Sequence, residues 1–113
     1  MTNAKILIVD DYKESINNFK SKLNFLGFSN IEIASSGYSA LEQLTLAAES
    51  NKAFDMVFID MQMPIMDGWR LASEINNNKK IIIAPVSRYV SRVIFRIHIG
   101  FIGMLLLLVY YYK

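Results

Sequence analysis

The sequence predicts a doubly wound α/β domain, in which helices cover both faces of a parallel sheet. Short continuous apolar runs, typical of strands buried on both faces, alternate with segments whose apolar residues recur every three or four positions. This strict strand and helix alternation favours right-handed crossovers and parallel pairing. With 113 residues, 53% of them hydrophobic, the chain is long enough for one core and too short for two. We therefore expect a single domain over residues 1–113.

The first strand is predicted over Lys5–Asp10 (KILIVD), a run of branched apolar residues that ends in a carboxylate. The helix that follows should begin with a capping pair, Asp11 and Glu14, and end at Gly27. Its sheet-facing stripe is formed by residues spaced three or four apart, namely Ile16, Phe19, Leu23 and Leu26.

The second and third strands are predicted over Ile31–Ser35 (IEIAS) and Asp55–Asp60 (DMVFID). Between them, Ser39 and Glu42 form a possible capping box for a second helix. The apolar side of that helix should carry Leu41, Leu44 and Ala48.

After the third strand, Asp67 is expected to cap a third helix, which the run NNNKK closes. A fourth strand is predicted over Ile81–Ala84 (IIIA), and apolar residues dominate again near the end of the sequence. The apolar face of the third helix should consist of Trp69, Leu71, Ala72 and Ile75.

Three carboxylates are expected to meet at one edge of this sheet. Asp10 and Asp11 close the first strand and Asp60 closes the third, and the carboxyl ends of parallel strands lie at the same edge. Clustered carboxylates raise one another's pKa unless a cation neutralises them, and oxygen-only ligands favour Mg²⁺. Pro64 and Gly68 would shape a tight turn that keeps this site open to a phosphoryl donor.

Composition excludes several function classes. A net charge of +2, from 12 basic and 10 acidic residues, provides no strong field for nucleic acid. The absence of cysteine excludes disulfides, thiolate metal sites and thiol nucleophiles. Because the apolar run before Asp10 is too short for a secretory leader, we expect a cytoplasmic protein.

Asp10 and Asp11 after ILIV, together with DMQMPIMDG beginning at Asp60, resemble the receiver domain of two-component response regulators, in the form often fused to hybrid histidine kinases. The resemblance covers Lys5 to about Ala84 and is weak over residues 85–113. It implies a five-stranded flavodoxin-like sheet of order 2-1-3-4-5, a histidine kinase or phosphotransfer protein as partner, and a signalling role rather than an enzymatic one.

The resemblance also implies roles for individual residues. Asp60 would accept the phosphoryl group, while Asp10 and Asp11 would hold Mg²⁺ and Gln62 would add its backbone carbonyl as a further ligand. Ser87 falls where the family has a hydroxyl residue that senses the phosphoryl group. Phosphoryl transfer asks mainly for positioning and charge neutralisation, which these groups can provide.

The sequence departs from the family pattern near its end. Leu107 and Leu108 stand where the family has lysine and proline, and Met104 occupies the usual aromatic switch position. No residues remain for the family's last helix, so an exposed apolar face is expected to favour self-association. Residues 97–112 are shorter than the usual membrane span of about 20 residues, so we favour contact with a second subunit over contact with a membrane.

The sequence is compatible with three functions. The leading hypothesis is a phosphoacceptor receiver, and the second is a degenerate receiver that acts only as a protein-interaction module because Leu107 replaces the lysine. A small hydrolase with Asp60 as nucleophile ranks last, because Gln62 cannot serve as an additional acid or base.

Overall fold

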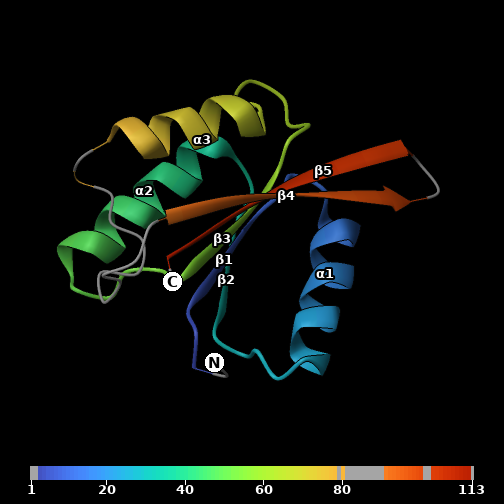
Figure 1. The fold of residues 1–113 in the computed structure, drawn as a ribbon, viewed down its shortest axis with the longest axis horizontal. Helices are drawn as coiled ribbons and strands as arrows, with labels where there is room; N and C mark the ends of the chain where they lie inside the picture. The colour runs from blue at the N-terminus through green and yellow to red at the C-terminus, as the bar shows by residue number, and fades with distance from the viewer. Residues whose placement is uncertain (1–2, 79, 81–90, 101–102, 113) are drawn as a thin grey trace.

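The structure is a computed structural model and describes residues 3–78, 80, 91–100 and 103–112 (Figure 1). Strands and helices alternate up to the third helix, and two strands follow. The elements are β1 (Ile6–Val9), α1 (Lys13–Phe25), β2 (Ile31–Ala34), α2 (Gly37–Glu49), β3 (Met56–Asp60), α3 (Gly68–Asn77), β4 (Ser91–Gly100) and β5 (Gly103–Tyr112).

The parallel part of the sheet has the predicted order. β1 lies between β2 and β3 and pairs with both in parallel, so that Ile8 is opposite Ile33 on one side and Phe58 on the other. Parallel pairing directs the carboxyl ends of all three strands to one edge. The prediction of a doubly wound α/β fold is confirmed for these strands and the three helices around them.

The last two strands differ from the predicted order 2-1-3-4-5. The sheet runs β2-β1-β3-β5-β4, and β5 is antiparallel to both β3 and β4. Only two residues separate Gly100 from Gly103, and so short a connection can join strands only in the antiparallel sense. The strand predicted over Ile81–Ala84 lies outside the described residues.

The pairing of β5 also changes the expectation for the apolar end of the sequence. Because β5 is hydrogen-bonded to β3 on one side and β4 on the other, its edges cannot pair with a strand of a second subunit. In the described part of the chain, no helix combines the length and the apolar character that a membrane crossing requires.

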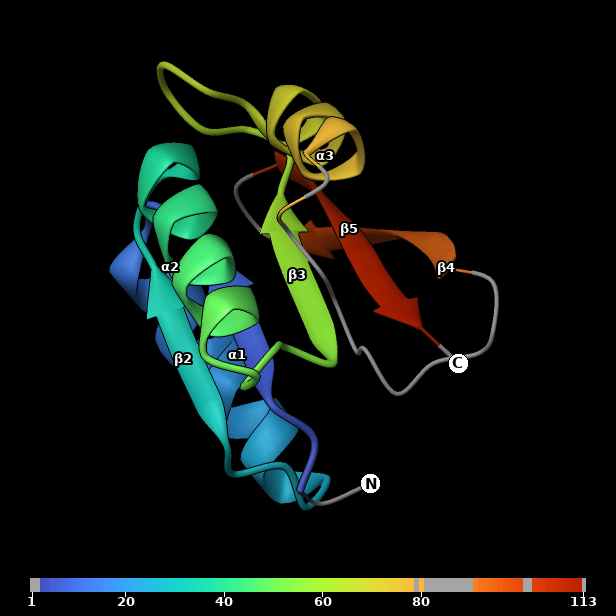
Figure 2. The ribbon, with the colours of Figure 1, turned by 90° about the vertical axis from the view of Figure 1, so that its left-hand side faces the viewer.

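Helices cover the two faces of the sheet unequally. Figure 2 shows α2 and α3 on one face and α1 on the other. The larger core lies under α2 and α3, where Leu44 and Leu71 pack with Leu7 and Val57. The smaller core lies under α1, where Leu23 packs with Ile6 and Ile8. On that side the rings of Phe19 and Phe58 meet edge to face at 4.8 Å. Both layers therefore fix β1 and β3, the strands that carry the carboxylates.

Two predicted helix ends are confirmed. Asp67 is the N-cap of α3, and its Oδ1 accepts a hydrogen bond from the backbone N–H of Arg70 at 2.8 Å. Gly27, with φ of 97°, follows the C-cap Leu26 in a left-handed conformation that favours glycine. Leu26 itself is exposed rather than part of the apolar stripe, because the helix ends before it.

Two predicted capping pairs are wrong. The N-cap of α1 is Tyr12, and no side chain caps it, so Asp11 and Glu14 do not form a capping pair. The N-cap of α2 is Ser36, whose Oγ accepts from the N–H of Ser39 at 3.1 Å. Ser39, which the sequence predicted as the cap, therefore lies inside the helix and donates its N–H to the actual cap, Ser36.

Candidate functional site

The structure brings Asp10, Asp11 and Asp60 together at the carboxyl edge of β1 and β3. One carboxylate oxygen from each of the three lies within 4.8 Å of the others. Asp10 and Asp60 are buried, with exposed fractions of 4% and 2%, and Asp11 is exposed. The cluster thus has a buried floor of two carboxyl groups and a solvent-facing third.

Local backbone hydrogen bonds orient both buried carboxyl groups in the same way. Oδ1 of Asp10 accepts from the N–H of Tyr12, and Oδ1 of Asp60 accepts from the N–H of Gln62, both at 2.9 Å. In each case an aspartate at a strand end bonds the backbone two residues ahead, which is the usual Asx turn. Each strand therefore ends in a turn that holds its own carboxyl group in place.

Burial and mutual repulsion raise the pKa of the two buried carboxyl groups. Burial, followed by the nearby charges of Asp10 and Asp11, raises the pKa of Asp60 from 3.8 to about 7. Burial also raises the pKa of Asp10, although the hydrogen bond from Tyr12 opposes the rise. In the folded protein the two buried carboxyl groups therefore ionise less readily, and a nearby positive charge would favour their ionised form.

The donor set fits a small hard cation. Three carboxylates provide only oxygen ligands, which Mg²⁺ and Ca²⁺ prefer, and the exposed Asp11 leaves the cluster accessible from solvent. No buried side-chain nitrogen or oxygen among the described residues lacks a hydrogen-bond partner, so the fit is one of charge and ligand type.

The loop between β3 and α3 approaches Asp60 very closely. The N–H of Gly68 donates to the carbonyl of Met61 at 3.2 Å, and a Cβ at position 68 would lie 2.6 Å from the carbonyl oxygen of Asp60. Glycine is therefore required at this position by space. The first residue of α3 thus packs directly against the backbone of Asp60.

Other predicted site residues have different outcomes. Gln62 is next to the cluster and binds Asp60 through its N–H, while the role expected for its carbonyl remains a prediction. Ser87 lies outside the described residues. Leu107 is the cross-strand Cα partner of Asp60 in the antiparallel pairing of β3 and β5. The residue expected at the family's lysine position is therefore the Cα neighbour of Asp60 across the sheet, while that equivalence remains a prediction.

Sequence reasoning missed Tyr12 and Ile65. The Asx turn at Tyr12 could have been found, because an aspartate at a strand end favours such a turn. Ile65 carries no such signal: its φ is 68°, a left-handed conformation that is unusual for a β-branched residue.

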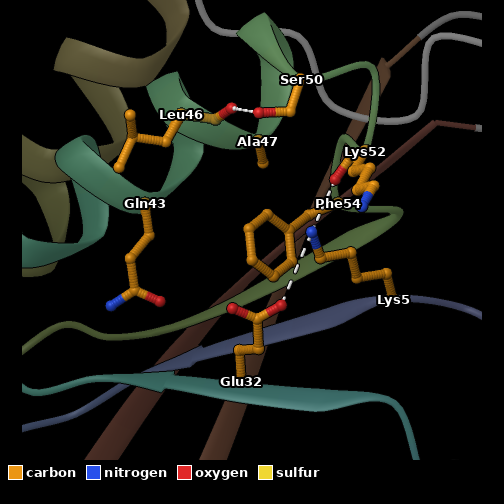
Figure 3. A pocket seen from close by; sticks show the side chains of 8 residues that line it. All are labelled: Lys5, Glu32, Gln43, Leu46, Ala47, Ser50, Lys52 and Phe54. Atoms are coloured by element: carbon orange, nitrogen blue, oxygen red, sulfur yellow. Dashed lines mark hydrogen bonds and ion pairs between the residues drawn. The ribbon is translucent and has the colours of Figure 1, made fainter.

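Two hollows of the described surface lie away from the carboxylates. One, of about 210 Å³, lies at the amino end of β1, where Nζ of Lys5 lies 4.3 Å from the centre of the Phe54 ring (Figure 3). The same amine donates to the carbonyl of Lys52 at 2.6 Å and pairs with Glu32 at 3.5 Å. These contacts tie three segments together, so we assign this hollow a structural role. A shallower one, of about 440 Å³, lies at the end of α1.

Comparisons with known proteins relate the chain to one family. The family model of the response regulator receiver domain matches residues 6–105. The osmosensing histidine protein kinase SLN1 of Saccharomyces cerevisiae is 36% identical over 67 residues, which are 59% of this chain and 6% of that kinase. The chemotaxis protein CheY-3 of Vibrio cholerae is 37% identical over 84 residues, which are 74% of this chain and 61% of that protein.

A solved structure shows the same fold. The N-terminal domain of a response regulator receiver protein from Methanoculleus marisnigri JR1 superposes with a TM-score of 0.57 at 30% identity, covering 68% of this chain and 58% of that one. The chain thus spans between 6% and 61% of the length of the relatives named here.

The fold and the acidic edge define a receiver module of two-component signalling. The chain belongs to the response regulator receiver domain family, as its sequence predicted.

Proposed function

We propose that this domain accepts a phosphoryl group from a phosphohistidine onto Asp60, with Mg²⁺ held by Asp10, Asp11 and Asp60. The observation that carries the proposal is the cluster itself, in which Asp60 is 2% exposed and its carboxyl group lies within reach of two others. A helix cap or a solvated strand end would not need two buried carboxyl groups at one point.

The transfer would proceed by attack of a carboxylate oxygen of Asp60 on phosphorus. The bond from phosphorus to the imidazole nitrogen breaks, and an acyl phosphate remains on Asp60. The imidazole takes up a proton from solvent and leaves as the neutral base. The Asx turn to the N–H of Gln62 holds the attacking carboxyl group at the strand end, which limits the motion needed to reach the phosphorus.

When bound, Mg²⁺ would supply positive charge for the carboxylates and for the transferred oxygens. Asp10 and Asp11 would hold it beside Asp60, and the carbonyl of Gln62 would complete the protein ligands. Because the pKa of Asp60 lies near 7 without the cation, a counter-charge would also keep the carboxylate ionised for attack at neutral pH.

In this proposal the domain is a signalling module of the cytoplasm, and its partner is a histidine kinase or a phosphotransfer protein. It turns over no substrate beyond the phosphoryl group that it receives. Its relatives support this setting, since one is a histidine kinase and another a chemotaxis protein.

The test is intact-mass analysis after incubation with phosphoramidate and MgCl₂. We expect addition of one phosphoryl group to the unmodified protein, and none to Asp60→Asn or to a sample treated with excess EDTA. Asp55→Asn is a matched control, because Asp55 ends no strand and lies outside the cluster. Phosphorylation of Asp60→Asn at the unmodified rate would show that another residue accepts the group.

A second candidate is a receiver that binds partners but responds weakly to phosphorylation. The specific observation is that Leu107, the partner of Asp60 across the sheet, is not a lysine. Without that cation no side chain at this position can favour the phosphorylated state. The two candidates differ in one result: the weakly responding domain would gain the phosphoryl group with little change in its amide chemical shifts.

A further inference from the structure

A phosphoryl group on Asp60 would bring more negative charge to the cluster than one metal ion offsets. Such a group carries between about 1.5 and 2 negative charges at neutral pH, and the carboxylates of Asp10 and Asp11 lie beside it. Mg²⁺ offsets only part of this combined charge. Among the side chains that the structure describes, no basic one pairs with the cluster, and the ion pair found there joins Lys5 to Glu32. A further cation would therefore stabilise the phosphorylated site.

Strand pairing places Arg96 in the same row of the sheet as Asp60. Asp60 is opposite Leu107 in the pairing of β3 with β5, and Leu107 is opposite Arg96 in the pairing of β5 with β4. Residues directly opposite each other share one face of a sheet. Paired Cα atoms of antiparallel strands lie about 4.5–5.5 Å apart, so the Cα atoms of Asp60 and Arg96 are about 10 Å apart on the same face.

That face is the one to which both buried aspartates belong. Phe58, two residues before Asp60, packs with the core under α1. Ile8, two residues before Asp10, is a member of that same core. Because successive residues of a strand alternate between the two faces, both aspartates fall on the α1 face. The row that runs from Asp60 to Arg96 therefore lies on the side of the sheet that carries the acidic cluster.

We propose that Arg96 binds the oxygens of the phosphoryl group on Asp60, reaching over Leu107 from the neighbouring edge strand. This inference rests on the proposed function, because it adds a phosphoryl-binding residue to the same site. Arginine carries its guanidinium on a long apolar stem, which can lie along apolar surface such as that of a leucine. The guanidinium is planar and presents a fork of N–H donors that matches two phosphate oxygens at once. Arg96 would thus supply the positive contact that a leucine at position 107 cannot.

Two other basic residues lie close to the cluster in sequence. Lys13 and Arg70 are in the first turns of α1 and α3, and both are exposed. Water and salt screen exposed charges strongly. Neither residue shares a row of the sheet with Asp60, since both are in helices. Lys13, which follows Asp11 by two residues, is included in the test as the alternative cation.

The test measures how fast variants of the full chain form an acyl phosphate, by intact mass against time in phosphoramidate and MgCl₂. In this reaction an oxygen of Asp60 bonds to phosphorus while the bond from phosphorus to nitrogen breaks, and ammonia leaves. The variant is Arg96→Gln, which removes the charge and keeps a long polar side chain. Arg96→Lys keeps the charge.

Arg92→Gln is the matched control. Arg92 is on the same strand and the same face as Arg96, but its row passes through Tyr111 to Met56. Four residues separate the two arginines, which is about 14 Å along a strand. The control therefore removes the same charge from the same element, at a distance from Asp60 that an arginine does not span.

We expect Arg96→Gln to lower the rate of acyl phosphate formation by about tenfold or more, and Arg92→Gln or Lys13→Gln to lower it by less than about twofold. Arg96→Lys should recover most of the rate, because it restores the positive charge. The affinity for beryllofluoride in the presence of Mg²⁺ should fall in the same order, since this mimic offers fluorine atoms in place of the phosphoryl oxygens. Urea unfolding should give Arg96→Gln and Arg92→Gln the same midpoint.

Several results would overturn the proposal. Equal rates for Arg96→Gln and the unmodified protein would remove Arg96 from the site while leaving Asp60 as the acceptor. Equal losses in Arg96→Gln and Arg92→Gln would show an effect of net charge alone, and a loss confined to Lys13→Gln would assign the contact to α1. An Arg96→Lys protein as slow as Arg96→Gln would show that charge is not what Arg96 contributes. Failure of phosphoramidate to label the unmodified protein would instead refute the proposed function, and the role of Arg96 with it.

Discussion

Replacing Asp60 with asparagine should stabilise the fold at neutral and alkaline pH, because it removes a carboxylate whose ionisation the folded state disfavours. The folded pKa is about 7 and the ordinary value is 3.8. Between these values the unfolded chain has lost its proton and the folded chain has kept it. The free energy of unfolding of the unmodified protein should therefore fall as pH rises from about 4 to about 7, and stay level above that.

The size of the effect follows from the same shift. At about 1.4 kcal/mol per pH unit, a rise from 3.8 to about 7 corresponds to at most about 4 kcal/mol. Asp10 is coupled to Asp60, and the exposed Asp11 lets solvent approach the cluster. We therefore expect Asp60→Asn to gain on the order of 2 kcal/mol at about pH 8, and little at about pH 4.

The measurement is urea unfolding followed by the fluorescence of Trp69, the only tryptophan in the sequence, at about pH 4 and about pH 8 without divalent metal. Glu74→Gln, which removes an exposed carboxylate on α3, is the control and should shift stability equally at both pH values. An Asp60→Asn protein that is less stable at about pH 8, or that gains equally at both pH values, would rule out the repulsion inferred for the cluster.

Three further predictions concern residues around the cluster. Gly68→Ala should cost about 1–3 kcal/mol in urea unfolding, because its Cβ would lie 2.6 Å from the carbonyl oxygen of Asp60, whereas Gly37→Ala should cost less since it meets mainly the side chain of Met66. Asp67→Ala should cost about 1 kcal/mol by the same assay because it removes the cap of α3, and Asp67→Asn should retain most of that stability. Leu107→Lys should enlarge the amide chemical-shift response to beryllofluoride, since it introduces a cation at the cross-strand partner position of Asp60, and an equally large response in the unmodified protein would contradict this.

The acidic edge could be predicted because it depends on local signals. The runs ILIV and MVFI are short, branched and apolar, and each is followed at once by aspartate. Alternation with amphipathic helices then makes the strands parallel, which brings Asp10 and Asp60 to one edge whatever the remaining strands do. Both carboxyl groups are buried in the folded chain.

The last strands could not be predicted because their pairing depends on distant residues. The apolar run before Tyr110 is compatible with a strand in either direction, and sequence periodicity does not determine which other strand it pairs with. The short connection after Gly100 is compatible with a hairpin, whereas the predicted order 2-1-3-4-5 came from the family resemblance. Pairing of Leu107 with Asp60 is thus a property of the folded sheet alone.

The cap of α2 and the conformation of Ile65 could not be predicted from the sequence for a different reason. Ser36 and Ser39 are both suitable N-caps, and their sequence positions differ by less than the usual error of a predicted helix end. Ile65 has a φ of 68°, which opposes the intrinsic preference of a β-branched residue, so no local signal in the sequence predicts it. Functional sites are where such conflicts between local preference and fold are expected.

The identity of the phosphorylated residue tests the proposed function most directly. After incubation with phosphoramidate and MgCl₂, borohydride reduction converts an aspartyl phosphate to homoserine, which peptide mass spectrometry can locate. We predict homoserine at position 60 and at no other aspartate, with none when the metal is removed. Homoserine at Asp10 or Asp11, or an unreduced position 60 in protein that carries the phosphoryl group, would contradict the assignment of Asp60 as the acceptor.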